Sequence, residues 1–229
     1  MLNKSNLTSI KKFNSEDVEL LEQEEVYSGF HRIVRMRLRH RLYGGGWSNP
    51  IDREISDRGE AASVVVYDPE LDAVCLVEQF RAATMRKPSG DITALGNTKT
   101  STSSPWSLEI VAGMLDKEGE TPEELVRREL QEEAGLTPSY IEKITSYWVS
   151  PGGSSARMHI YVALCDLQNA GGIYGLEEES EDILAEVVPL ETVYQYSINE
   201  ESSNAATLIG LQWLTINRER LYHRWKAKE

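Results

Sequence analysis

Apolar and polar residues alternate along the N-terminal part of the chain, between residues 18 and 42. Val34, Met36 and Leu38 stand at every second position, and an arginine follows each of them. A period of two predicts a strand with one apolar and one basic face, and the glycines at 44–46 end it. The basic face has two interpretations: a solvated sheet surface, or a surface that meets an anion or an acidic partner subunit.

Longer apolar runs follow and predict buried strands. The runs AASVVVYD (61–68) and AVCLVEQF (73–80) flank a turn sequence, and together they predict a β-hairpin. Residues 82–105 are small and polar with interspersed prolines and glycines, which is typical of a long surface loop. Strands accompanied by few helices favour a mixed α/β or α+β layer architecture. Further strands are expected at 106–113, 144–150, 156–165 and 184–189, and helices at 190–198 and 204–226.

Composition narrows the classes of partner. The chain has 229 residues, of which 40% are hydrophobic, so it can form a substantial core. Its net charge of −13 argues against partners such as nucleic acid and anionic membranes, because both need a basic surface. Small phosphorylated substrates stay compatible with this charge, since divalent cations bridge acidic proteins to phosphates.

The N-terminus and the cysteines indicate the compartment. The N-terminus has no apolar segment of a signal peptide, and no run approaches about 18 consecutive apolar residues. Cys75 and Cys165 both lie in apolar runs, which predicts buried thiols in strands instead of a disulfide or metal pair. We therefore expect a soluble protein of the cytoplasm.

An acidic segment at 113–136 carries the richest chemistry of the chain. Thr121 and Glu124 form a capping box, Pro122 stands where the first turn of a helix tolerates proline, and Gly135 is a C-terminal glycine. These signals predict a helix that begins after Thr121 and ends at Gly135. Its apolar stripe, at helical spacing, consists of Val126, Leu130 and Ala134.

Three glutamates of this helix, Glu129, Glu132 and Glu133, share one face because they lie three and four residues apart. Like charges at this spacing repel, and a divalent cation would resolve the conflict; Mg²⁺ takes a few carboxylates together with waters and phosphate oxygens. The alternative is a solvated charged helix held by the pairs Glu123–Arg127 and Glu124–Arg128. Spacing alone leaves both interpretations open.

Residues 128–136 read R-E-L-Q-E-E-A-G-L, which resembles the core of the Nudix box, GX5EX7REUXEEXGU with U apolar. Glu120 stands at the required distance before Arg128. The chain departs from the pattern between Gly113 and Glu120, where six residues stand in place of five. The extra residue precedes the helix, so we expect the helix carboxylates to keep their places.

The resemblance implies an α+β fold of the Nudix type, an α/β/α sandwich whose box binds one to three Mg²⁺ or Mn²⁺ ions. It implies metal ligation by Glu129 and Glu133, with Glu132 next in line and the carbonyl of Ala112 as a backbone ligand. Members of the family hydrolyse nucleoside diphosphates linked to another group. Structural support, with an arginine that orients a neighbouring glutamate, is implied for Glu120 and Arg128.

Two loops resemble the ADP-ribose pyrophosphatases of the family. Pro151, in SPGG at 150–153, lies fifteen residues after the end of the box, an offset that marks this group. The loop GLEEESEDI (175–183) contains five carboxylates, and its alternative interpretation is a solvated acidic loop. Its resemblance to the catalytic loop of the group implies that Glu179 is the general base and Glu181 a metal ligand.

The similarity extends to the stretches at 53–62, 77–81, 108–114 and 204–214. It implies that residues 1–60, after a polar tail at 1–15, form a small antiparallel β domain whose strands swap across a homodimer. Residues 61–229 would form the hydrolase domain.

The resemblance also implies that the substrate lies between subunits, with adenine against an aromatic ring, for which Phe30 of the other subunit is the candidate. Ala156 stands where an acidic residue is often found after SPGG, so the choice of terminal sugar stays open. The other expected substrate contacts are Arg53, Glu54, Arg81, Met114, Ser150, Pro151 and Gly152.

Together these features predict Mg²⁺-dependent hydrolysis of ADP-ribose to AMP and ribose 5-phosphate. One alternative is a Nudix pyrophosphatase for another nucleoside diphosphate, such as GDP-mannose. A second is a Nudix-fold sensor that binds its ligand without cutting it, which the complete set of box carboxylates disfavours.

Overall fold

The computed structural model describes residues 12–84, 104–199 and 204–227. The chain forms two compact units. The smaller consists of Met1–Gly59 and Trp148–Ala156, and the larger of Glu60–Tyr147 and Arg157–Glu229. The sequence indicated a boundary near residue 60 but did not indicate that the segment around SPGG joins the smaller unit. Most of the expected loop at 82–105 lies outside the described residues.

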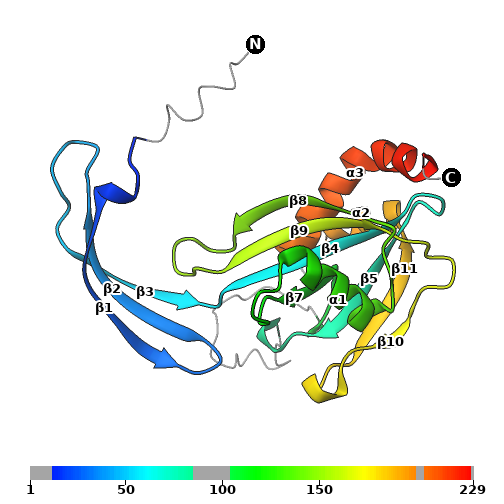
Figure 1. The fold of residues 1–229 in the computed structure, drawn as a ribbon, viewed down its shortest axis with the longest axis horizontal. Coiled ribbons are helices and arrows are strands. Elements are labelled where there is room, and N and C mark those ends of the chain that lie inside the picture. The colour runs from blue at the N-terminus through cyan, green and yellow to red at the C-terminus, as the bar shows by residue number, and fades with distance from the viewer. Residues whose placement is uncertain (1–11, 85–103, 200–203, 228–229) are drawn as a thin grey trace, which may run out of the picture. The chain divides into compact units, whose positions relative to one another are not determined.

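The smaller unit contains an antiparallel sheet of three strands in the order β1-β2-β3 (Figure 1). Its strands are β1 (Val18–Ser28), β2 (Arg32–His40) and β3 (Ile51–Asp57), and the 3₁₀ turn η2 (Ser15–Asp17) precedes them. The prediction of one strand over residues 18–42 was wrong, because a tight turn, in which Gly29 N donates to the His31 carbonyl, divides it into a hairpin. The regular alternation belongs to β2, whereas β1 departs from it at two register shifts, between Leu20 and Glu22 and between Glu25 and Tyr27.

Ion pairs cover the basic face of this sheet. The arginines of this face of β2 lie opposite carboxylates of β1 and β3: Arg35 contacts Glu24 and Glu54 at 2.9 and 3.0 Å, and Arg39 contacts Glu19 at 2.6 Å. All these side chains are exposed to solvent, where each pair stabilises little. The face is therefore neutralised within one chain, which favours the interpretation of a solvated surface.

The part of the smaller unit that the structure describes has almost no hydrophobic core. Among its described residues, Val34 is the only apolar side chain that is buried. Leu20, Val26 and Tyr27 are 52%, 39% and 58% exposed. Exposed apolar side chains in this number on one small sheet mark a surface that a protein partner can cover.

The larger unit is built on one sheet in the order β10-β11-β5-β4-β9-β8, with β6 paired to β5 and β7 to β4. β4 and β9 are parallel, and the other described pairings are antiparallel. The expected strand over 106–113 is broken at Ile110, because its two halves pair with different strands. The strands are β4 (Glu60–Asp68), β5 (Ala73–Phe80), β6 (Trp106–Glu109), β7 (Val111–Met114), β8 (Tyr140–Trp148), β9 (Arg157–Leu164), β10 (Gly172–Tyr174) and β11 (Ile183–Pro189).

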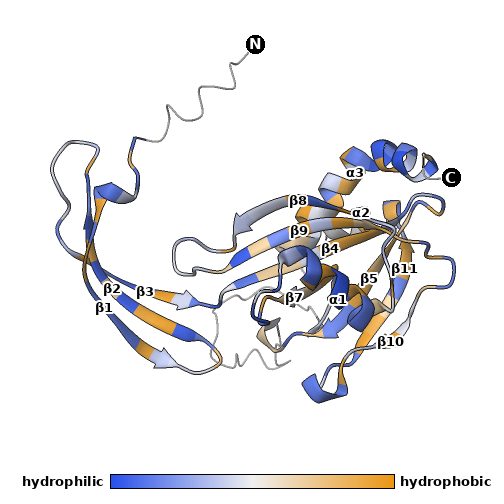
Figure 2. Cartoon of the chain, viewed as in Figure 1, coloured by the Kyte–Doolittle hydropathy of each residue, from blue (hydrophilic) through white to orange (hydrophobic). Residues whose placement is uncertain are grey.

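Helices cover both faces of this sheet. In Figure 1, α1 (Pro122–Ala134) lies in front of the sheet, and α2 (Leu190–Asn199) and α3 (Ala205–Lys226) lie behind it. The alternation along β4 explains the two layers: Val64 and Val66 pack with α1, and Val65 packs with α2 and α3. Figure 2 shows the matching pattern, with hydrophobic residues along β5 and β11 and hydrophilic residues on the outer surface of α1. The predicted α/β/α sandwich is confirmed.

The two cysteines contribute to the core between the sheet and α1. Cys75 and Cys165 are free and buried, as predicted, and burial raises the pKa of each thiol to about 12. Both thiols therefore stay protonated and unreactive at neutral pH. No helix in the described ranges is long and apolar enough to cross a membrane.

Candidate metal and active site

Local sequence signals set the limits of α1. The hydroxyl of Thr121 accepts from Glu124 N at 3.3 Å, and the Glu124 carboxylate accepts from Thr121 N at 2.8 Å, which forms the predicted capping box. At the other end, Gly135 has φ +63° and donates its N–H to the Gln131 carbonyl. A side chain at Gly135 would also lie 2.7 Å from the ring of Tyr174. The helix that carries the glutamates is thus held in register at both ends.

Arg128 is the centre of an ion-pair cluster on α1. Its guanidinium donates to both oxygens of Glu120, at 2.9 and 3.2 Å, and through Nη1 to Glu129 at 2.9 Å and Glu132 at 2.8 Å. The pKa of Glu120 is lowered, chiefly by the hydrogen bonds from Arg128. The pair Glu123–Arg127 forms at 2.9 Å. Glu124 instead accepts a hydrogen bond from Thr121 N in the capping box, so only one of the two ion pairs of the alternative interpretation forms.

Two helix glutamates are held in an environment that disfavours their charge. Glu133 is 2% exposed; one of its oxygens accepts from Ala112 N at 3.1 Å, and the other from the amide of Gln79 at 3.5 Å. Burial raises the pKa of Glu133 to about 8 and that of Glu129 to about 7, and the charges of nearby carboxylates add to both shifts. A positively charged partner beside these carboxyl groups would therefore favour their charged state at neutral pH.

Gly113 makes room for one of these carboxylates. A β-carbon at this position would lie 2.0 Å from Glu129 Oε1 and 2.3 Å from its carboxyl carbon. Because β7 and α1 approach so closely, a side chain at this position would displace the Glu129 carboxylate. The first glycine of the box therefore has a packing role that the sequence pattern alone does not reveal.

The acidic loop at 175–183 lies against α1. Gly175 N donates to the Glu132 carbonyl at 3.2 Å, and the Glu181 carboxylate accepts from Leu176 N at 3.3 Å. Glu179 ends the 3₁₀ turn η4 (Glu177–Glu179) and is exposed. The charges of Glu181 and Glu179 both raise the pKa of Glu129, in addition to its burial, so the loop carboxylates lie within electrostatic range of the helix. The structure thus brings together the acidic residues that the sequence placed in two segments.

Arg81 lies beside the same carboxylates, where it is bound by a residue that the sequence interpretation missed. Its Nε and Nη2 atoms donate to the two oxygens of Glu109, at 3.2 and 3.0 Å. Burial opposes the charge of Arg81, but Glu109, Glu133 and Glu181 outweigh it, and the pKa of the guanidinium is raised. The carboxyl within the run LEIVAG was the one available signal for Glu109, because a charge in an apolar strand needs a partner.

These donors fit a divalent cation in kind. Glu129, Glu132, Glu133 and Glu181 supply carboxylate oxygens, which Mg²⁺ and Mn²⁺ prefer. Within the described ranges, however, no three acidic, histidine or cysteine side chains already have the arrangement of a metal site. Arg128 binds two of the carboxylates, and the Ala112 N–H holds a third. A bound cation would therefore have to compete with Arg128 for Glu129.

Most of the remaining expected contacts belong to the smaller unit. Phe30 is 81% exposed, with the Arg58 guanidinium 5.2 Å from its ring centre. Arg53 Nη1 donates to the Asp52 carbonyl, and Glu54 accepts from Arg35. Ser150, Pro151 and Gly152 are exposed in a turn of the same unit. In the larger unit, Met114 is 36% exposed at the end of β7.

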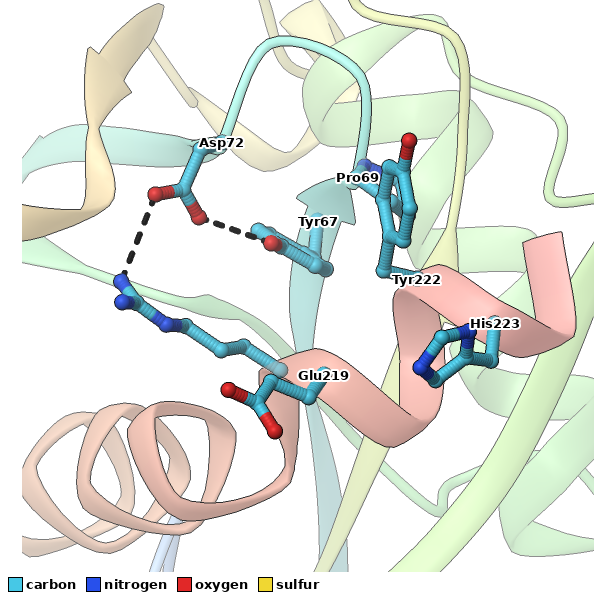
Figure 3. Close-up of a pocket in the computed structure, with 7 residues that line it drawn as sticks. Tyr67, Pro69, Asp72, Glu219, Tyr222 and His223 are labelled. Carbon is cyan, nitrogen blue, oxygen red and sulfur yellow. Dashed lines mark hydrogen bonds and ion pairs between the residues drawn. The ribbon is translucent and has the colours of Figure 1, made fainter. Parts of the chain in front are cut away.

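A separate hollow of about 440 Å³ lies at the turn between β4 and β5, beside the end of α3 (Figure 3). In it, Tyr67 and Arg218 contact the two oxygens of Asp72, at 2.7 and 3.4 Å. Because its buried polar groups are paired and it contains none of the expected site residues, we place the chemistry at α1 instead. The hollow is lined by Tyr67, Pro69, Asp72, Arg218, Glu219, Tyr222 and His223.

Known proteins resemble this chain over most of its length. The NUDIX domain model matches residues 57–208. ADP-ribose pyrophosphatase of Haemophilus influenzae is 39% identical over 220 residues, which cover 96% of each chain. The protein of the same name from Escherichia coli K12 is 41% identical over 213 residues, 93% of this chain and 95% of its own. A GDP-mannose pyrophosphatase from Enterobacter is 31% identical over 168 residues, 72% of this chain and 78% of its own.

A solved structure supports the fold. The crystal structure of an ADP compounds hydrolase matches with a TM-score of 0.60 over 88% of this chain and 96% of that chain, at 19% identity. The family model covers more than half of the chain, and the relatives that are 39% and 41% identical extend over most of it. The chain therefore belongs to the Nudix family.

Proposed function

We propose that the protein hydrolyses the diphosphate of ADP-ribose to AMP and ribose 5-phosphate with the help of Mg²⁺. The observation that carries the proposal is the convergence of Glu129 and Glu133 on α1 with Glu179 and Glu181 of the acidic loop. The relatives from Haemophilus and Escherichia, named ADP-ribose pyrophosphatases, extend over nearly the same length as this chain. The relative named for GDP-mannose is less similar and covers less of it.

The residues proposed to hold the cation are Glu129, Glu133 and Glu181, with Glu132 and the carbonyl of Ala112 completing the set. When bound, Mg²⁺ (or Mn²⁺ in its place) offsets the charge of the diphosphate and lowers the pKa of the attacking water. Glu133 is the most constrained of these donors, since its two oxygens are oriented by Ala112 N and Gln79. Its position is therefore set before any ligand arrives.

Glu179 is the proposed general base. It is exposed, it lies on the loop and not on the crowded helix, and its charge reaches Glu129. A carboxylate on an exposed loop can reach an attacking water and accept its proton. Arg128 and Glu120 would keep Glu129 and Glu132 in place, because the guanidinium binds all three carboxylates at once.

The substrate and the assembly depend on the smaller unit. We propose that two chains associate through the exposed apolar side chains of its sheet, which include Leu20, Val26 and Tyr27. Phe30 would then stack on the adenine of a substrate bound in the partner. Arg81 would bind the diphosphate or the terminal ribose. The other proposed substrate contacts are Arg53, Glu54, Met114, Ser150, Pro151 and Gly152.

A panel of nucleoside diphosphate compounds tests the proposal. Wild-type protein and Glu133→Gln are incubated with ADP-ribose, GDP-mannose and a dinucleotide in Mg²⁺, in Mn²⁺ and in EDTA, and the products are separated. We expect AMP and ribose 5-phosphate from ADP-ribose with either metal, none in EDTA, and a loss of about 1,000-fold in Glu133→Gln. Glu24→Gln, which removes an exposed carboxylate of the smaller unit, serves as the matched control.

Three outcomes would overturn the proposal. Faster hydrolysis of GDP-mannose than of ADP-ribose would change the assigned substrate. Ala156 makes this comparison necessary, because it stands where an acidic residue is often found after SPGG and so leaves the terminal sugar open. Tight ADP-ribose binding without cleavage would indicate a sensor. Near-wild-type activity of Glu133→Gln would show that the catalytic metal does not bind at α1.

A further inference from the structure

We propose that Glu109 is a positioning residue: it holds the Arg81 guanidinium toward the substrate phosphates and away from the carboxylates that take the cation. The inference rests on the proposed function, because it assigns the diphosphate as the group that Arg81 meets. It concerns a residue outside the Nudix box, on a strand that otherwise contributes to the core.

The sheet places the two side chains on one face. In the pairing of β5 with β6, Val77 lies opposite Glu109, and Gln79 lies opposite Ser107. Since side chains two residues apart share a face, Arg81 lies on the same side as Val77 and Gln79. Val77 packs into the core beneath α1, so this is also the face of the helix glutamates.

The contact is a two-point ion pair with one buried partner. Nε and Nη2 of Arg81 meet the two carboxylate oxygens of Glu109 at 3.2 and 3.0 Å. The Glu109 side chain is 6% exposed, whereas that of Arg81 is 39% exposed. This fork-to-carboxylate geometry fixes the plane of the guanidinium as well as its position.

The pair leaves part of the guanidinium available. Among the described residues, no hydrogen-bond acceptor contacts Nη1 of Arg81, so its two protons can serve a ligand. A planar group with free donors, partly open to solvent and bearing a fixed charge, is suited to phosphate oxygens.

Core stability does not account for Glu109. Burying a carboxylate is unfavourable, and an ion pair in the interior is frequently no more stabilising than apolar side chains of similar size. The residues on either side of it in the sequence, Leu108 and Ile110, are apolar. A carboxylate at 109 therefore needs a reason beyond packing, and its contact with Arg81 supplies one.

The surroundings of Arg81 explain why it needs a partner of its own. The charges of Glu133 and Glu181 both act on its guanidinium, and Arg81 in turn lowers the pKa of Glu133 against the larger effect of burial. An arginine not held by Glu109 would be drawn to these two carboxylates. It would then compete with the cation for its ligands, as Arg128 already does at Glu129.

Glu109→Gln and Arg81→Ala, alone and combined, test the inference. Two readouts are measured: the dissociation constant of Mn²⁺ without substrate, by titration calorimetry, and kcat and KM for ADP-ribose in saturating Mg²⁺. For Glu109→Gln we expect Mn²⁺ binding to weaken by about 10-fold and KM to rise by about 10-fold, since each tenfold step corresponds to one interaction of about 1.4 kcal/mol. Arg81→Ala alone should raise KM without weakening Mn²⁺ binding.

The double variant separates positioning from a general loss of structure. If Glu109 acts through Arg81, Glu109→Gln in the Arg81→Ala background leaves Mn²⁺ affinity unchanged. Glu123→Gln removes an exposed carboxylate of α1 and is the matched control for net charge. Arg81→Lys, which keeps the charge but loses the fork, gives the same test of KM if Glu109→Gln does not fold.

Unchanged Mn²⁺ affinity and KM in Glu109→Gln, or weakened Mn²⁺ binding that persists in the double variant, would overturn the inference. Failure of the proposed function gives a different result: wild-type protein would then not cleave ADP-ribose. The Mn²⁺ titrations would still report whether Glu109 keeps Arg81 away from the carboxylates.

Discussion

The two units use dense charge in opposite ways. In the smaller unit, the arginines of β2 alternate with carboxylates on β1 and β3, and pairs such as Arg35–Glu54 and Arg32–Asp57 are exposed and balanced. In the larger unit, the carboxylates of α1 and the acidic loop face two arginines, and Glu129 and Glu133 have strongly raised pKa values because they are buried. Charged side chains that are exposed and paired form a solvated surface. Charge that is buried and in excess marks a place for a ligand of opposite sign.

After Glu133→Gln, the largest effect is expected from Gly113→Ala, which tests the crowded contact between β7 and Glu129. The new β-carbon would lie 2.0 Å from Glu129 Oε1, so the carboxylate must move while the backbone stays. We expect kcat/KM for ADP-ribose to fall by about 100-fold, because the moved group is a proposed metal ligand. The change is measured by steady-state kinetics over a range of Mg²⁺ concentrations.

Gly44→Ala is the control for this substitution. A β-carbon at Gly44, in the smaller unit, meets nothing within 4 Å. Its activity and its unfolding temperature should both match the wild type. Equal activity of the two variants would show that the position of Glu129 does not matter.

A second prediction concerns stability in the absence of metal. The folded-state pKa of Glu133 is about 8 and that of Glu129 about 7, both raised from an ordinary value of 4.5 chiefly by burial. A raised carboxyl pKa contributes stability that is complete below pH 4.5 and is lost as the pH rises through the folded-state value. The unfolding temperature in EDTA should therefore fall between about pH 5 and pH 8.

Divalent metal should reverse this loss, since a cation favours the charged carboxylates. Thermal unfolding followed by circular dichroism, with EDTA or with Mg²⁺ at each pH, measures both trends. In Glu133→Gln the fall with pH should be smaller. A metal-free protein whose stability rises over this range would contradict the buried, acid-rich description of α1.

The smallest effect is expected from the balanced face of the smaller unit. Arg37 contacts Asp52 at 3.7 Å with both side chains exposed, so Arg37→Gln should shift the unfolding temperature by no more than about 2 °C. Thermal unfolding at low and high salt measures this. A shift several times larger would mean that the ion pairs of this sheet stabilise the fold. The two units would then differ less in their use of charge.

Local features of the fold were predictable. The capping box at Thr121, the glycine at 135 and the stripe through Leu130 involve residues within a few positions of one another, and each was correct. The strand prediction over 18–42 was wrong, because the chain reverses between β1 and β2, and the regular alternation that suggested one strand belongs to β2 alone. The break at Ile110 was also missed, since it reflects pairing with two different strands.

The sequence by itself determined the acidic helix, its limits and the presence of the Nudix box, because spacing along a helix sets which side chains share a face. Only the tertiary structure decided which charges are buried and which partners they meet. Glu109 and Arg81 stand 28 residues apart, and no local pattern relates them. The acidic loop reaches α1 through the contact of Gly175 with Glu132. Burial and long-range pairing arise when distant segments pack, and these contacts turn a charged helix into a candidate active site.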